Sequence, residues 1–164
     1  MAILKSSRHS YVVGKFGEHS ICNWLSRSGF EVTIVDHTGI DILAYHPKLG
    51  KRLGISVKSR TRNIGTETTS VTIFRYDKQP DDRSKLIAAC AAFACEPWIA
   101  VYVETEKFAD IFLTSLGNFD TRYRTKTAKT LDSWKMSNAH VNRYKSDENI
   151  KYIRINFNTH NWDW

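Results

Sequence analysis

The sequence has few cysteines and no long apolar run. Its three cysteines, Cys22, Cys90 and Cys95, are too few and too irregularly spaced for a disulfide framework or a zinc knuckle. No stretch approaches the roughly 20 apolar residues that a membrane span requires. The N-terminal residues also lack the apolar run and cleavage site of a signal peptide. We therefore expect a cytoplasmic protein with reduced cysteines and no membrane as a partner.

Several other signals are missing from the chain. There is no internal repeat, no low-complexity segment and no linker rich in Pro, Gly or Ser. The sequence has no Gly-rich phosphate-binding loop and no Ser or Cys nucleophile signature. Its six histidines show no metal-ligand spacing. With 164 residues, 41% hydrophobic and 25% charged, the chain predicts one globular domain over residues 1–164.

Charge is what the sequence has in excess. Lys and Arg number 24 against 17 for Asp and Glu, which gives a net charge of +7, and a basic surface favours a polyanionic partner. Residues 48–63 contain no acid, and a second stretch interleaves cations with aromatics, a pattern suited to phosphates and exposed bases. The alternative is an ordinary solvated face. The candidate nucleic-acid contacts are Lys51, Arg52, Arg60, Arg62, Arg122, Arg124 and Lys126.

Hydrophobic periodicity predicts a mixed α/β domain. Helices are expected over residues 12–28, 80–95 and 128–145, of which the second is apolar almost all round and should be buried. Strands are expected over residues 30–35, 39–45, 53–60, 68–76, 98–104, 110–114 and 150–157. This order predicts a single domain built on one central mixed sheet flanked by helices.

Three charged residues occupy positions where core residues are expected. Glu18 lies in the apolar stripe of the first helix. If residues 39–45 and 53–60 form a hairpin about residue 49, Asp41 lies opposite residues 56 to 58, so that Asp41 and Lys58 become cross-strand neighbours. Buried charges need partners or a metal ion. Simple salt bridges remain an alternative for each of the three.

The residues Gly17-Glu18, Gly39-Ile40-Asp41 and Ser56-Val57-Lys58 resemble the motifs of the PD-(D/E)XK nuclease superfamily, nearest to its Holliday-junction-resolvase-like and restriction-endonuclease-like branches. The motifs cover about residues 12–60, and the order of elements extends the resemblance to about residue 104. The resemblance implies a restriction-endonuclease-like fold, with a basic and aromatic extension over about residues 105–164.

The resemblance also implies roles for the motif residues. Glu18 and Asp41 would hold a divalent metal directly or through water, with the Val57 carbonyl as a further ligand, while Lys58 would position the attacking water. Oxygen ligands of this kind suit Mg²⁺ or Mn²⁺. Ser56 departs from the pattern, which has Glu, Asp or Gln at this position. A serine leaves the site one negative charge short. Asp36, Glu67 and Asp77 are candidate replacements.

The sequence therefore predicts a Mg²⁺- or Mn²⁺-dependent nuclease that hydrolyses phosphodiester bonds, with catalytic residues Glu18, Asp41, Ser56 and Lys58. The resemblance alone favours DNA over RNA. A homodimer would suit an enzyme that cuts both strands. The alternative is a catalytically inactive protein of the same fold that binds DNA or RNA or acts as an assembly subunit. Trp162 and Trp164 are expected to pack on the domain or on a second subunit.

Overall fold

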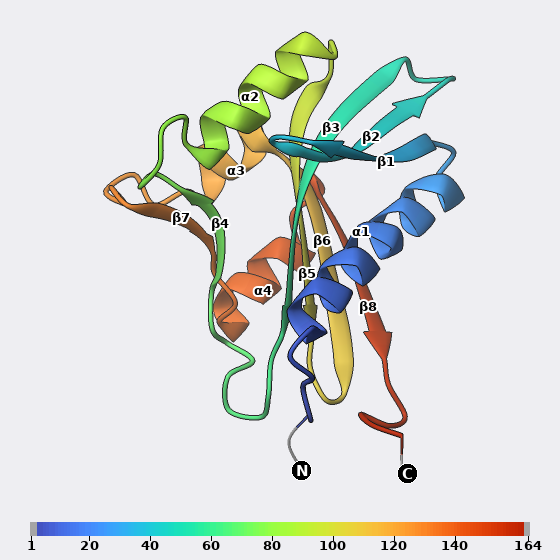
Figure 1. The fold of residues 1–164 in the computed structure, drawn as a ribbon, viewed down its shortest axis with the longest axis vertical. Helices are drawn as coiled ribbons and strands as arrows, with labels where there is room; N and C mark the ends of the chain where they lie inside the picture. The colour runs from blue at the N-terminus through green and yellow to red at the C-terminus, as the bar shows by residue number, and fades with distance from the viewer. Residues whose placement is uncertain (1–2, 163–164) are drawn as a thin grey trace.

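A long helix and three antiparallel strands open the fold. The computed structural model describes residues 3–162. Helix α1 (His9–Arg27) buries Val13, Gly17, Ile21 and Leu25, which recur every four residues and so form one face of the helix. Gly29, with a φ of 88°, ends this segment. The strands β1 (Glu31–His37), β2 (Ile40–His46) and β3 (Lys51–Thr61) follow as a meander (Figure 1).

The central sheet has six strands in the order β1-β2-β3-β5-β6-β8. Its later members are β5 (Glu96–Glu104), β6 (Phe108–Ser115) and β8 (Ile150–Asn156). The β3–β5 pair is parallel, and every other pair in this sheet is antiparallel. A parallel pair needs a crossover connection, and this crossover contains β4 (Val71–Arg75) and α2 (Asp82–Ala92).

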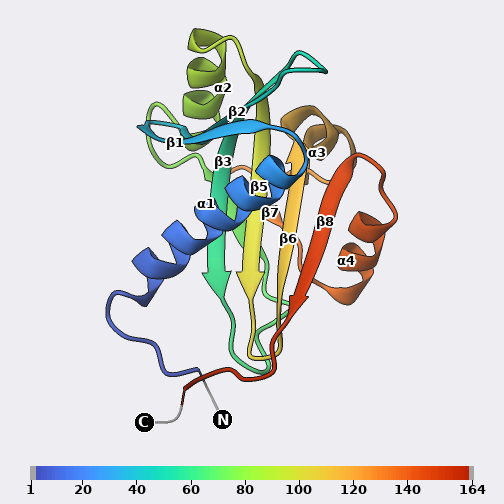
Figure 2. The same cartoon turned by 90° about the vertical axis from the view of Figure 1, so that its right-hand side faces the viewer.

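The two faces of the sheet are covered differently. Helix α1 lies across one face, where its apolar stripe packs on residues of β2, β3, β5 and β6 (Figure 2). The other face packs against α2, α3 (Leu116–Arg122), α4 (Asn138–Lys145) and a two-stranded sheet of β4 and β7 (Leu131–Trp134). Trp134 of β7 is buried at the centre of this second core and stacks on Tyr144 of α4.

The fold class predicted from the sequence is confirmed, because the structure is a single α/β domain with a central mixed sheet flanked by helices. The order α1-β1-β2-β3-β4-α2-β5 agrees with the helices and strands expected from the sequence over the same part of the chain. Strands β6 and β8, from the C-terminal part of the chain, extend the same sheet. In the part of the chain that the structure describes, none of the helices has the length and apolarity needed to cross a bilayer.

Three local predictions were wrong. Residues 128–145 are not one helix, because residues 131–134 pair with β4 as a strand and α4 starts only after its N-cap, Ser137. The short helix α3 was missed altogether. Helix α2 is buried on one side only, by Leu86, Ala89 and Cys90, and Ile87 is 46% exposed.

The C-terminal tryptophans were also expected to pack on the domain or on a second subunit. Trp162 is 80% exposed on this chain, so it does not pack on the domain. Trp164 lies outside the described residues.

Candidate active site

Asp41, Ser56 and Lys58 line one small polar pocket on the side of the sheet that faces α2. The pocket has a volume of about 210 Å³. Asp41 and Ser56 come from adjacent strands, and Lys58 follows Ser56 on the same face of β3. The remaining lining residues are Thr38, Gly39, Asp82 and Lys85. The first half of the pocket thus comes from the β1–β2 turn and the strands, and the second from the first turns of α2.

Strand pairing explains how the pocket forms. In the β2–β3 ladder, Ile42 is opposite Ile55, and Asp41 lies one residue beyond that pair. There the Asp41 carboxylate takes the place of a ladder partner, because its Oδ2 accepts a hydrogen bond of 2.6 Å from the Val57 N–H. The second oxygen, Oδ1, has no hydrogen-bond partner among residues 3–162. One carboxylate oxygen therefore stays available to a ligand in the pocket.

The charge of Asp41 is only partly compensated. Burial raises the pKa of Asp41 above its usual value, and the hydrogen bond from Val57 and the Lys58 ammonium act against that shift. Negative Glu18 raises the pKa further. No cationic side chain forms an ion pair with Asp41 within the described residues. A cation entering the pocket would meet a carboxylate that lacks a full partner.

Glu18 does not line this pocket. Helix α1 covers the opposite face of the sheet, where Gly17 lies against Ser59 and Tyr102. The Glu18 side chain is 14% exposed, as its helical position predicted, but it pairs with Lys15 at 2.9 Å. Its charge still influences Asp41. Glu18 is therefore a neighbour of the pocket and not part of its wall.

The pocket offers hard oxygen donors from two carboxylates, Asp41 and Asp82, and one hydroxyl, Ser56. Within residues 3–162, no group of three or more His, Cys, Asp and Glu side chains is arranged to hold a metal ion. Mg²⁺ is usually held by one or two carboxylates and keeps several waters, and a volume of about 210 Å³ accommodates such waters. The donor set fits a hydrated hard cation.

Asp82 and Lys85 were not among the predicted site residues. The sequence signal was the pair Asp81-Asp82 at the start of the helix. Asp81 is the N-cap and accepts a 2.8 Å hydrogen bond from the Ser84 N–H. One acid is enough for a cap, so the second acid of the pair is the signal that could have identified Asp82. The three candidate replacements for the missing acid, Asp36, Glu67 and Asp77, do not line the pocket.

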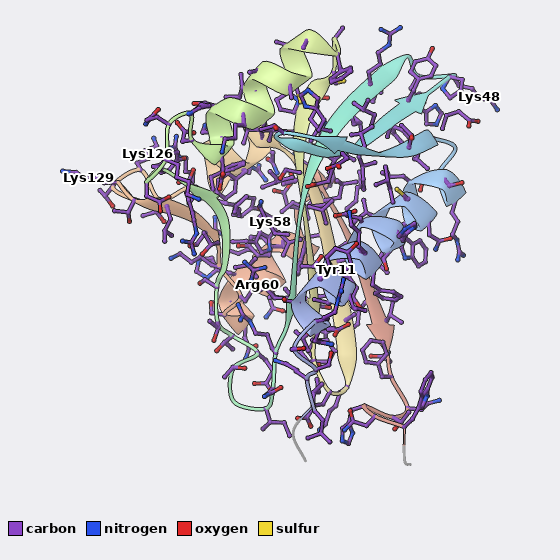
Figure 3. All side chains as sticks on the ribbon, in the orientation of Figure 1. Tyr11, Lys48, Lys58, Arg60, Lys126 and Lys129 are labelled. Carbon is purple, nitrogen blue, oxygen red and sulfur yellow. The ribbon has the colours of Figure 1, made fainter. Side chains whose placement is uncertain are left out.

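The predicted nucleic-acid contacts lie in three separate places. In Figure 3, Lys58 and Arg60 lie near each other on β3, whereas Lys126 lies at the far end of the β4–β7 sheet and Lys48 at the tip of the β2–β3 hairpin. Lys51 and Arg52 begin β3 next to that tip and are exposed. Arg60 is exposed and lines a separate pocket at the start of α1, and its guanidinium donates to the Ser59 carbonyl.

Three of the predicted arginine contacts already have partners within the fold. Arg62 donates to the Ser70 carbonyl at 3.0 Å and so closes the loop between β3 and β4. Arg122 pairs with Asp147 at 3.2 Å, and Arg124 pairs with Asp132 at 3.1 Å. Arg122 remains half exposed. Lys58 and Lys85 are the cations that line the pocket within the described residues.

No model of a protein family and no curated protein matches this chain. Among solved structures, the chain is similar to a Holliday junction resolvase, Hjc, from Archaeoglobus fulgidus. The two share 16% sequence identity with a TM-score of 0.49, over 71% of this chain and 86% of that one. At this level of similarity, the function of the chain has to be argued from its own residues.

Proposed function

We propose that the chain is a metal-dependent nuclease that hydrolyses phosphodiester bonds, with DNA as the favoured substrate and Mg²⁺ or Mn²⁺ as the cofactor. The observation that carries this proposal is the pocket in which Asp41, Ser56 and Lys58 meet. A buried carboxylate with one open oxygen lies there beside a lysine that has no ion pair in the described part of the chain. The net charge of +7 supports a polyanionic substrate.

The roles follow from the positions of the side chains. Asp41 would hold the metal with its open oxygen, the Val57 carbonyl is the backbone ligand that the family pattern implies, and Glu18 would act through water. When bound, the metal neutralises phosphate charge and lowers the pKa of its water. Lys58 donates hydrogen bonds from the pocket wall and stabilises the charge that develops on the phosphate oxygens. Arg60 would contact a backbone phosphate of the nucleic-acid strand and so position the substrate.

A homodimer is part of the same proposal, because cutting both strands of a duplex at one place requires two active sites. The second candidate function is a nuclease-fold protein that binds nucleic acid without cutting it. Ser56 favours this candidate, since a hydroxyl binds Mg²⁺ more weakly than a carboxylate does. The lack of a three-residue metal cluster in residues 3–162 favours it as well.

Cleavage assays with linear and branched DNA distinguish the two functions. The purified chain should cut DNA in Mg²⁺ or Mn²⁺ but not in a chelator, and Asp41→Ala should lower the cleavage rate by about 10²- to 10³-fold or more. Asp36→Ala, which removes an exposed acid from β1, is the matched control and should cut normally. If neither DNA nor RNA is cut while salt-sensitive binding persists, the binding function is correct and the nuclease is excluded.

A further inference from the structure

We propose that Asp82, in the first turn of α2, is the second carboxylate ligand of the pocket and takes the role that the superfamily pattern gives to an acid at position 56. This inference rests on the proposed function, because it concerns the same metal. The ligand set would then combine Asp41 from β2, Ser56 from β3 and Asp82 from α2 around one hydrated Mg²⁺ or Mn²⁺.

The wall of the pocket contains a second carboxylate. Asp82 is the only carboxylate besides Asp41 among the residues that line the pocket in the described part of the chain. Glu18 is the alternative second acid, but it lies on α1, pairs with Lys15 at 2.9 Å and does not contribute to the wall. The acid that Ser56 lacks is therefore present in the pocket, supplied by another element.

Backbone packing fixes α2 next to the β1–β2 turn, which leads into Asp41. Gly39, two residues before Asp41, has a φ of 94°, which favours glycine. A Cβ at this position would lie 2.5 Å from the carbonyl carbon and oxygen of Lys85 and 2.8 Å from the Leu86 nitrogen. The β1–β2 turn thus rests directly on the first turns of α2. This contact places the start of α2, and with it Asp82, at the pocket.

The Ser56 hydroxyl lines the same pocket as the two acids. Ser56 is only 6% exposed and lines the pocket, and its hydroxyl, which forms no hydrogen bond within residues 3–162, is not among the fully enclosed unpartnered atoms of these residues and so opens onto the pocket. A buried polar group of this kind normally has a partner. A hydrated cation held by Asp41 and Asp82 would supply that partner, either as the ion or as one of its waters.

The contacts of Asp82 itself leave room for this role. Its Oδ2 accepts a long hydrogen bond of 3.2 Å from the Arg75 N–H, and its Oδ1 forms a long ion pair of 3.7 Å with the Lys85 ammonium. The competing explanation is that Asp82 only stabilises the positive end of the helix. Asp81 already provides a carboxylate and a cap at that end, and it does not line the pocket.

Mn²⁺ binding to the full chain, measured by electron paramagnetic resonance, tests the inference without reference to cleavage. Asp82→Asn should weaken Mn²⁺ binding at least about tenfold. Asp81→Asn is the matched control: it removes the same charge from the same helix end and keeps a good N-cap, so its affinity should stay within about twofold of the wild type. Adding Ser56→Asp to Asp82→Asn should restore most of the affinity, because the acid returns to β3.

The outcomes separate the two proposals. If Asp41→Asn abolishes Mn²⁺ binding while Asp82→Asn binds like the wild type, the role of Asp82 is refuted and the metal-dependent nuclease survives. If Asp82→Asn and Asp81→Asn weaken binding equally, Asp82 acts only through helix charge and the inference fails. If the wild-type chain binds no Mn²⁺, both the inference and the metal-dependent function fall. Rescue by Ser56→Asp supports the inference in a way that a general loss of stability cannot imitate.

Discussion

Two groups of carboxylates in this molecule differ in how their oxygens are used. The structural carboxylates, Asp110 on β6, Asp132 on β7 and Asp147 between α4 and β8, are 2–5% exposed. The pocket carboxylates are Asp41 and Asp82. Each structural carboxylate receives hydrogen bonds or ion pairs from at least two other side chains, whereas Asp41 receives one backbone hydrogen bond.

Asp147 and Asp41 show what this difference does to a titrating group. Burial would raise the pKa of Asp147, but hydrogen bonds from Tyr123, the Asn149 N–H and Asn118 outweigh it, so that its pKa is far below the usual range. For Asp41, burial prevails over the hydrogen bond from Val57 and the charge of Lys58, and the pKa is raised. A buried carboxylate with several hydrogen-bond donors around it stabilises the fold. A buried carboxylate with few donors keeps an oxygen that can bind a cation.

Substitution of Lys58 gives the largest expected effect, and it concerns the pocket alone. Lys58→Ala should lower the rate of metal-dependent cleavage by about 10²- to 10³-fold, because the ammonium that stabilises phosphate charge is lost. The free energy of unfolding should change by less than about 1 kcal/mol, as measured by urea denaturation. Lys48→Ala, at the hairpin tip, is the control with full activity. Equal losses in the two variants would show that the pocket has no special role.

Substitution of Asp132 should give the opposite result. Asp132 is bonded to the Tyr76 hydroxyl and to Arg124, and Arg83 lies 3.9 Å away. Asp132→Asn removes the buried charge that these donors share and should lower the free energy of unfolding by about 3 kcal/mol. Cleavage per folded molecule, measured at low temperature, should stay near the wild-type value. A stable but inactive variant would contradict the division into two groups.

The smallest effect is a pH dependence of stability that comes from Asp147. Its pKa in the folded protein lies below that of an unfolded Asp, which is about 4. Its contribution to stability is therefore fully present above about pH 4 and is lost as the pH falls through the depressed folded-state pKa. The melting temperatures of wild type and Asp147→Asn should differ most near neutral pH and converge in acid. A constant difference across pH would show that the Asp147 charge does not stabilise the fold.

The sequence predicted the strand half of the pocket because that half depends on local rules. Alternation along two strands of one hairpin places Asp41 opposite residues 56 to 58, and the turn-rich segment between them leaves little freedom of register. The same rules predicted most helices and strands of the central sheet. Their bounds differ by a few residues because helix ends and strand ends depend on capping and on neighbouring strands.

The residues that α2 contributes to the pocket could not be predicted by these local rules. Asp82 lies 24 residues after Lys58 along the chain, and its place depends on the contact between Gly39 and the backbone of Lys85. No periodic pattern encodes such a contact. The partners of the structural carboxylates could not be predicted from the sequence for a similar reason. Asp132 bonds to Tyr76, 56 residues away, and it falls in a segment predicted to be helical.

The contact between Gly39 and Lys85 has a consequence for which ion the pocket would select. Mg²⁺ demands metal–oxygen distances of about 2.0–2.1 Å, whereas Ca²⁺ accepts about 2.3–2.6 Å with more ligands. A Cβ at position 39 would press on the backbone of α2, and any shift of the helix would change the spacing of Asp82 from Asp41. Glycine at position 39, which has a hydrogen atom where other residues have Cβ, lets the β1–β2 turn pack this closely on α2. The residue at this turn would therefore influence which ionic radius the pocket accepts.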